Sequence, residues 1–170
     1  MTKTEYVNKF YTSAKAAQDK TGIPALATLA QGALESAWGK ICPGNMLFGI
    51  KDTDGVNGNE QLLTTTEYSR SATANFPRII SVTPVIRNGQ KWFKYTIKDY
   101  FRKYNTLEDS FVDHSQFFLK NKRYAKALAV KNDPYLFIDE IAKAGYATAP
   151  GYADTLKSIA RSIEKLIPNK

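Results

Sequence analysis

One carboxyl group in this sequence is set apart by its neighbours. Glu35 is the only charged residue between Lys20 and Lys40, in the segment TGIPALATLAQGALESAWG. If this segment is helical, Glu35 lies opposite the apolar residues and beside small neutral ones such as Thr28 and Gly32. A solvated helix face usually carries several charges, so this face is expected to be covered or to line a cleft. Loss of water would raise the pKa of Glu35, and an acid that stays protonated near neutral pH can serve as a general acid.

A second carboxyl group, that of Glu67, stands out because it lies in a β-forming segment. The segment Thr64-Thr-Thr-Glu67-Tyr68 favours a strand, in which an acid is unusual. An acid on a strand that faces an acid on a helix is a workable glycosidase arrangement: one protonates the leaving oxygen, and the other activates water or stabilises the developing positive charge. The residue types also permit simpler interpretations. Glu35 could form a structural ion pair, and Glu67 could be an edge-strand charge that discourages aggregation.

The helix that would position Glu35 is predicted from its start signal and its periodicity. Pro24 suits the first helical turn. Apolar residues then recur at the three- and four-residue spacing of one helix face, namely Leu26, Leu29, Ala30, Ala33, Leu34 and Ala37. This helix is expected to end near Trp38 and Gly39.

Another helix is predicted before it, over residues 3–20. Thr2 and Glu5 fit a capping box at its start, and Gly22 fits the left-handed position that follows a helix end. Its expected buried stripe consists of Tyr6, Phe10, Ala14 and Ala17.

The middle third of the chain changes to β-forming residues. Segments 61–68, 79–86 and 90–97 are rich in them, and Asn88-Gly89 is a strong hairpin signal. The last third returns to helix, with start signals at Thr106 and at Asp133-Pro134 and a final helix from about Gly151. We therefore expect one α+β domain over residues 1–170, mostly helical, with a small antiparallel β lobe inserted over roughly residues 60–98.

Composition excludes several classes of protein. The net charge of +8 attracts polyanions, but Lys and Arg are spread along the chain without a nucleic-acid or phosphate motif, so nucleic acid is not an expected partner. No apolar run is long enough for a membrane span. Cys42 and His114 are the only residues of their types, which excludes an internal disulfide and His-rich zinc sites. His114, which follows Phe111 in a predicted helix, is interpreted as a structural hydrogen-bonding residue.

Four short motifs, taken together, resemble one known family. They are Ala33-Leu-Glu35-Ser-Ala-Trp38-Gly39, Leu47-Phe-Gly-Ile-Lys51, Thr65-Thr-Glu67-Tyr68 and Ala144-Gly-Tyr146-Ala-Thr148. In this order they resemble the β-N-acetylglucosaminidase domain of glycoside hydrolase family 73, found in bacterial autolysins and in flagellar and phage peptidoglycan hydrolases. Two positions depart from the family pattern: Met46 replaces a usual Asn, and Ala149 replaces a usual Asp.

The resemblance implies a lysozyme-like fold, in which a helical lobe and a small β lobe enclose a cleft for the glycan. It implies that Glu35 is the general acid and that Glu67 is the second carboxylate. By motif position, the residues implied to bind substrate are Trp38, Phe48, Gly49 and Tyr146.

The expected function is that of an endo-β-N-acetylglucosaminidase, which cleaves the β-1,4 bond between N-acetylglucosamine and N-acetylmuramic acid in peptidoglycan. We expect a monomer that needs no metal or cofactor and acts on glycan strands in the periplasm or the extracellular cell wall. The N-terminal segment lacks the apolar core of a secretory signal, which leaves the export route open and permits a phage origin. Two alternatives remain: a lytic transglycosylase of lysozyme-like fold, and a non-catalytic module that binds cell-wall glycan.

Overall fold

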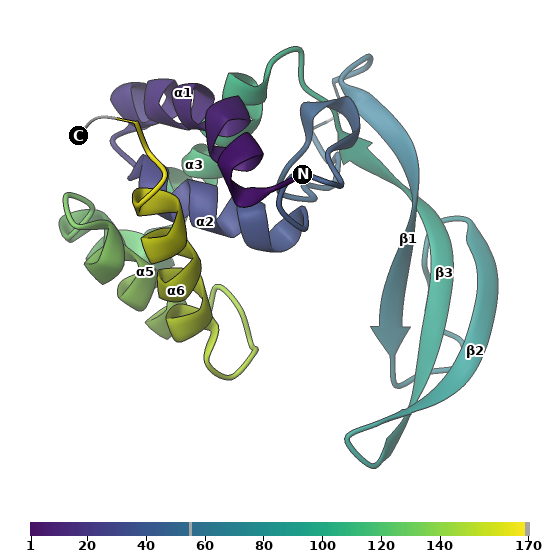
Figure 1. The fold of residues 1–170 in the computed structure, drawn as a ribbon. Helices are drawn as coiled ribbons and strands as arrows, with labels where there is room; N and C mark the ends of the chain where they lie inside the picture. Colours follow the sequence, from purple (N-terminus) through teal and green to yellow (C-terminus); the bar gives the residue numbers. More distant parts are fainter. Residues whose placement is uncertain (55, 169–170) are drawn as a thin grey trace. The chain divides into compact units, whose positions relative to one another are not determined.

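The computed structural model describes residues 1–54 and 56–168. The chain divides into two compact units (Figure 1). The helical unit comprises Met1–Gly49 and Tyr104–Lys170, and the β unit comprises Ile50–Lys103. The mostly helical α+β class predicted from the sequence is confirmed. No described helix combines the length and the apolar character that a membrane span requires.

Helix α1 (Lys3–Thr21) is fixed at both ends as predicted. The Thr2 hydroxyl accepts a hydrogen bond from the Glu5 backbone N–H, and the Glu5 carboxylate accepts one from the Thr2 backbone N–H. Gly22 follows the last turn with a φ of 73°, the left-handed conformation that glycine adopts without strain. The predicted stripe of Tyr6, Phe10, Ala14 and Ala17 is buried.

Helix α2 (Ala25–Glu35) packs against α1, α5 and α6 and is buried on almost every side. The neutral face that carries Thr28 and Gln31 is covered, with exposed fractions of 2% and 0%, as its lack of charge predicted. Leu34, which the periodicity assigned to the apolar face, is instead exposed. Because α2 has neighbours on both faces, the spacing of its apolar residues does not predict which side chains are buried.

The prediction that this helix continues to Trp38 and Gly39 is wrong, because α2 ends at Glu35. Ala37, Trp38 and Gly39 have φ values of 51°, 59° and 72°, a left-handed backbone that cannot continue a right-handed helix. The Ser36 hydroxyl donates to the Gly32 carbonyl and accepts a hydrogen bond from the Gly39 N–H. Pro24, expected inside the first turn, is the N-cap residue and has an extended ψ of 123°.

The second half of the helical unit follows the β unit in sequence. It contains α3 (Leu107–Lys120), α4 (Ala125–Ala129), α5 (Pro134–Lys143) and α6 (Tyr152–Glu164), with short 3₁₀ turns at η1 (Pro43–Asn45) and η2 (Lys122–Tyr124). The predicted start signals are confirmed. Thr106 forms a capping box with Asp109, and the Asp133 side chain accepts the N–H groups of Tyr135 and Leu136.

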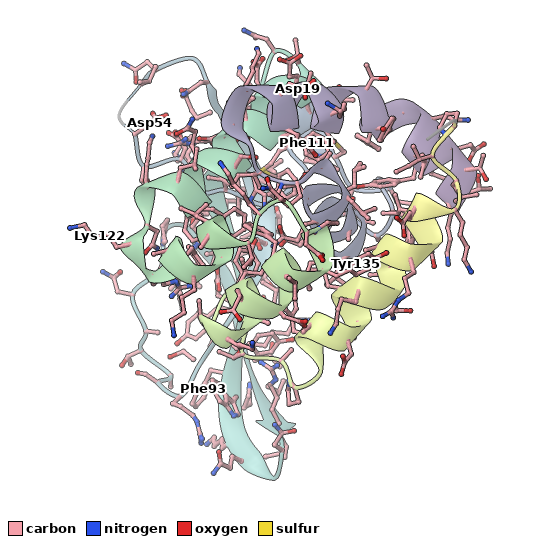
Figure 2. All side chains as sticks on the ribbon, turned by 90° about the vertical axis from the view of Figure 1, so that its left-hand side faces the viewer. Asp19, Asp54, Phe93, Phe111, Lys122 and Tyr135 are labelled. Atoms are coloured by element: carbon pink, nitrogen blue, oxygen red, sulfur yellow. The ribbon has the colours of Figure 1, made fainter. Side chains whose placement is uncertain are left out.

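The core of the helical unit is rich in aromatic side chains. Phe111, Phe118, Tyr124 and Phe137 are each 0% exposed. Figure 2 labels Phe111 among the side chains that crowd the space between the helices. Phe118 contacts Tyr124 and Phe137 edge to face, at centroid distances of 5.1 and 5.3 Å. Tyr146, in the segment that follows α5, packs against Phe118 and Tyr124 of this cluster.

The β unit is a three-stranded antiparallel sheet in the order β1-β3-β2. Its strands are β1 (Glu60–Ser69), β2 (Ile79–Arg87) and β3 (Gln90–Arg102). Asn88 and Gly89 have φ values of 50° and 70° and form the predicted two-residue turn. Glu67 pairs with Tyr95 across the ladder and therefore lies on the sheet face of Tyr95 and Ile97, both buried.

Candidate active site

Glu35 is the last residue of α2. The residue remains accessible to solvent, yet the protein around its carboxyl group removes enough water to raise the pKa to about 7. A hydrogen bond from the Tyr146 hydroxyl to Oε1 of Glu35, 3.2 Å long, opposes this effect and lowers the pKa. Desolvation is the larger of the two influences. Glu35 is thus protonated in a large fraction of molecules at neutral pH while a ligand can still reach it.

Tyr146 is positioned by the end of α5 and by neighbouring rings. Its backbone N–H donates to the carbonyl of Ile141 at 3.0 Å, directly after Gly145 with a φ of 77°. Its ring stacks against Tyr152 and Phe118 at centroid distances of 5.8 and 5.6 Å. The hydroxyl is therefore presented to Glu35 by a rigid aromatic stack.

A buried polar chain that the sequence did not predict supports this stack. Nε2 of Gln31 donates to the Tyr152 hydroxyl at 3.2 Å, and Oε1 of Gln31 lies 3.0 Å from Nε2 of His114. Burial lowers the pKa of His114 to about 3, so the ring is neutral and its Nε2–H donates to Gln31. An unpaired buried amide is costly, so these bonds tie α2 to α3 and α6. The interpretation of His114 as a structural hydrogen-bonding residue is confirmed.

Trp38 lies in the left-handed turn after α2 and is half-buried. Its ring contacts Tyr6 edge to face at a centroid distance of 5.5 Å, and Nζ of Lys3 lies 5.1 Å from the ring centroid. A methyl group at Gly39 would come within 2.6 Å of the Phe10 ring. The turn is therefore shaped by its contacts with α1, and the substrate-binding role of Trp38 stays a prediction.

Phe48 and Gly49 follow η1 in the second motif. Phe48 is 7% exposed and stacks flat on the His114 ring, with a centroid distance of 3.8 Å and an interplanar angle of 4°. It supports the buried polar chain, and only its rim is left for the predicted contact with substrate. Gly49 is exposed with a φ of 56°, and nothing lies within 4 Å of the position a Cβ would take. Its need for glycine comes from the backbone conformation.

Glu67 lies in the β unit, where a lysine holds it. Nζ of Lys51 is 3.0 Å from Oε1 of Glu67 and 2.9 Å from Oδ2 of Asp99. Lys51 forms an antiparallel bridge with Phe101, which places its side chain on the sheet face that carries both acids. The Glu67 side chain is partly accessible, with an exposed fraction of 33%. A carboxylate held in this way can stabilise a cation or activate water.

The structure brings Glu35 and Tyr146 into direct contact within the helical unit. Sequence reasoning missed three supporting residues: Gln31, Tyr152 and Lys51. The signal for Gln31 was present, since it is a lone amide on the same uncharged helix face as Glu35. Within residues 1–54 and 56–168, no group of three or more His, Cys, Asp or Glu side chains is arranged to hold a metal ion.

The hydrogen bond from Tyr146 predicts a shift in the pH profile. Because it lowers the pKa of Glu35, the Tyr146→Phe variant should have a higher Glu35 pKa than the parent. A general acid is lost as pH rises through its pKa, so the alkaline limb of kcat/KM, expected near pH 7 in the parent, should move to higher pH. Initial rates between pH 4 and 9 measure this shift. A limb that moves to lower pH in the variant would contradict the assignment.

The raised pKa of Glu35 also predicts a change in stability. Its pKa of about 7 in the folded state exceeds the ordinary value of 4.5, so the free energy of unfolding falls as pH rises from about 4.5 to about 7. Gln carries no ionisable proton. Thermal unfolding should therefore give the Glu35→Gln variant the same Tm as the parent at pH 4 and a higher Tm at pH 8. A lower Tm than the parent at pH 8 would mean that the ionised carboxylate is stabilised by the fold.

Comparison with known proteins adds independent information. The model of the glucosaminidase family, described as mannosyl-glycoprotein endo-beta-N-acetylglucosaminidase, matches residues 11–165. The chain is 32% identical over 167 residues to the peptidoglycan hydrolase FlgJ of Pseudomonas aeruginosa, a match that covers 94% of this chain and 36% of that protein. It is 28% identical over 144 residues to the exo-glucosaminidase LytG of Bacillus subtilis, covering 81% of this chain and 43% of that protein.

A solved structure shares the fold over nearly its full length. The C-terminally truncated glycoside hydrolase domain from Salmonella typhimurium FlgJ is similar with a TM-score of 0.70 and 26% identity, covering 96% of this chain and 99% of that chain. This chain spans less than half the length of the two curated relatives but almost all of the solved domain.

Proposed function

This chain belongs to the glucosaminidase family, glycoside hydrolase family 73, and on that basis we propose that it hydrolyses the glycan strands of peptidoglycan. The bond we assign is the β-1,4 linkage between N-acetylglucosamine and N-acetylmuramic acid. The observation that carries the proposal is the carboxyl group of Glu35, which is desolvated yet accessible and has a pKa of about 7. The names of the relatives, a peptidoglycan hydrolase and an exo-glucosaminidase, support the substrate class.

In the proposed mechanism, Glu35 donates its proton to the glycosidic oxygen as the bond to the anomeric carbon breaks. Tyr146 donates a hydrogen bond to the carboxylate that remains, which stabilises the product state of the proton transfer. We assign Glu67 the role of the second carboxylate, which stabilises the oxocarbenium-like centre or activates the attacking water. Trp38, the rim of Phe48 and the backbone at Gly49 are proposed to contact the sugars.

We further propose that the two units act together as one glucosaminidase domain over residues 1–170, as a monomer. The site of action is the periplasm or the extracellular cell wall, where peptidoglycan is found. The net charge of +8 suits a wall that carries anionic peptides and polymers.

Endo cleavage is the form of the activity that we propose, and the similarity to LytG supports exo cleavage as the second candidate. Digestion of purified peptidoglycan followed by mass spectrometry separates them. Endo cleavage should release fragments of many lengths that end in reducing N-acetylglucosamine, whereas exo cleavage should release disaccharides alone. An end lighter by one water identifies a lytic transglycosylase, and no release of fragments identifies a non-catalytic binding module. Either of the last two results would overturn the proposed function.

A further inference from the structure

One face of the β sheet gathers basic and aromatic side chains. The ladder pairs Tyr68 with Lys94 and Leu62 with Tyr100, so these side chains share the face opposite Glu67. Alternation along β3 adds Trp92 and Lys98 to the same face. The exposed basic residues on this face, called here the basic face, are Arg70, Arg78, Arg87, Lys94 and Lys98. Arg102, at the end of β3, also lies on this face but is half-buried and pairs with Asp54.

Aromatic rings hold three of these arginines. The guanidinium of Arg87 lies 4.0 Å from the Tyr68 ring centroid, and that of Arg70 lies 4.5 Å from the Trp92 ring centroid. The Arg78 guanidinium lies 5.8 Å from the centroid of Tyr100 at the other end of the sheet. A guanidinium over a ring loses conformational freedom and can still present N–H groups at its edge to an anion, although one nitrogen of Arg70 already donates to the Gln90 side chain. A guanidinium lies over each of these rings, while Tyr68 and Tyr100 remain 41% and 42% exposed.

Charge is unevenly distributed between the two faces of the sheet. The acids Glu67 and Asp99 both lie on the opposite face, where they pair with Lys51. Glu60, the first residue of β1, lies at the end of the basic face opposite Arg102, and its carboxylate accepts the backbone N–H of Gly58. Among the described residues, none of the five basic side chains of the basic face forms a salt bridge. Their positive charge is therefore uncompensated.

The dimensions of the basic face favour a linear ligand. From Trp92 to Tyr100, β3 extends for about 27 Å at about 3.4 Å per residue. Arg70 and Arg87 lie near one end of this span and Arg78 near the other, through their contacts with Trp92 and Tyr100. Exposed hydroxyl groups between them add hydrogen-bond donors, namely those of Thr64, Thr66, Ser81 and Thr83. A single small anion would engage only one end.

We propose that the basic face binds a linear polyanion with repeating phosphodiester groups and no bases, the chemistry of a cell-wall polyol-phosphate polymer. Phosphate fits the fork of an arginine side chain, and three of the five cations are arginines. Single-stranded nucleic acid is recognised by stacking of bases on aromatic faces, and a base would have to displace the arginine that lies over Tyr68, Trp92 or Tyr100. This binding would hold the chain on the wall independently of turnover.

Fluorescence of Trp92 gives a direct readout of this binding. The chain has two tryptophans, Trp38 and Trp92, so a Trp38→Phe background leaves a single reporter on the basic face. Titration with poly(glycerol phosphate) at low salt should change the Trp92 emission and saturate, and added salt should weaken the binding. Poly-L-glutamate and mixed-sequence single-stranded DNA, titrated at matched charge, should bind more weakly.

The decisive variant removes three charges from the basic face by Arg70→Gln, Arg87→Gln and Lys94→Gln. Its matched control removes three exposed charges from the helical unit by Lys120→Gln, Lys122→Gln and Lys126→Gln. We expect the first variant to lose at least about tenfold in affinity for the phosphate polymer and the control to lose less than about twofold. Circular dichroism checks that both are folded.

A second variant tests the arginines without changing the charge. Arg70→Lys with Arg87→Lys should weaken binding by about threefold, because the ammonium group cannot form the planar fork; an unchanged affinity would overturn the role of the ring-held guanidiniums. If the two charge-removal variants lost the same affinity for the phosphate polymer, binding would depend on net charge alone, and the proposal would be overturned. Equal or tighter binding of DNA or poly-L-glutamate, or no binding by the parent, would also overturn it. Hydrolysis of peptidoglycan is measured separately, so failure here leaves the proposed function intact.

Discussion

Replacement of Glu35 by Gln should lower kcat by about 10²–10⁴-fold, the usual contribution of a general acid–base group. The amide has nearly the same shape as the acid but has no proton to transfer to the leaving oxygen. KM should change little, because the variant keeps the accessible end of α2 and can still accept the hydrogen bond from Tyr146. Release of soluble fragments from purified peptidoglycan, measured at pH 6, gives the rate.

The control for this variant is Glu140→Gln, which removes an acid that pairs with Lys143, three residues further along the chain. That change should leave the rate within about twofold of the parent. If the Glu35→Gln variant kept more than about a tenth of the parental rate, the general acid would be another residue. A folded but inactive variant, with the Tm behaviour expected above, would support the assignment.

Replacement of Glu67 by Gln should lower kcat by about a hundredfold if this carboxylate stabilises the oxocarbenium-like centre or activates water. The ion pair with Lys51, at 3.0 Å, fixes the position of the Glu67 carboxylate. Rates on peptidoglycan measure the loss, and added azide should restore turnover if the missing function is that of a nucleophile or a base.

Asp99 offers the matched control for Glu67, because it binds the same lysine at 2.9 Å but is less accessible, with a side-chain exposed fraction of 13% against 33%. Asp99→Asn should cost less than about fivefold in kcat. If both variants lost activity equally, the effect would come from the environment of Lys51. Near-parental activity in Glu67→Gln would remove Glu67 from the mechanism and leave the acetamido group of the substrate to act in its place.

Local signals in the sequence were sufficient for most of the helices and for the hairpin. Capping boxes at Thr2 and Thr106 and the Asn88-Gly89 turn depend on residues two or three positions apart, so the sequence determines them directly. The lysozyme-like class rested on the family motifs, and the similarity to the glycoside hydrolase domain of FlgJ confirms it. Glu35 was singled out by the absence of other charges on its helix, and the neutral face that carries Thr28 and Gln31 is covered, as that absence predicted.

Features that depend on distant contacts could not be predicted. The end of α2 is set by the hydrogen bonds of the Ser36 hydroxyl and by the packing of Gly39 against Phe10. The spacing of apolar residues in the sequence does not predict either contact. The bonds that join Gln31 to His114 and Tyr152 span 83 and 121 residues. Such bonds are a property of the assembled helices.

The motif residue Phe48 shows a further limit of sequence reasoning. Motif position assigned it to substrate binding, because a motif preserves both residues that touch substrate and residues that support them. In the structure its ring stacks on His114 and is nearly buried. Lys51, in the same motif, instead proves to be the partner of Glu67. The substrate-binding role of Phe48 stays a prediction, and the contact between Lys51 and Glu67 is one that the motif did not indicate.

The titration of Glu35 itself tests the central claim most directly. With the glutamate side-chain carboxyl carbons labelled with ¹³C, the Glu35 resonance can be assigned by its absence from the Glu35→Gln variant and followed by NMR from pH 3 to pH 9. We predict a midpoint at about pH 7, which desolvation of the carboxyl group requires. A midpoint near the ordinary value of 4.5 would mean that Glu35 is ionised at neutral pH, and would contradict its role as the general acid.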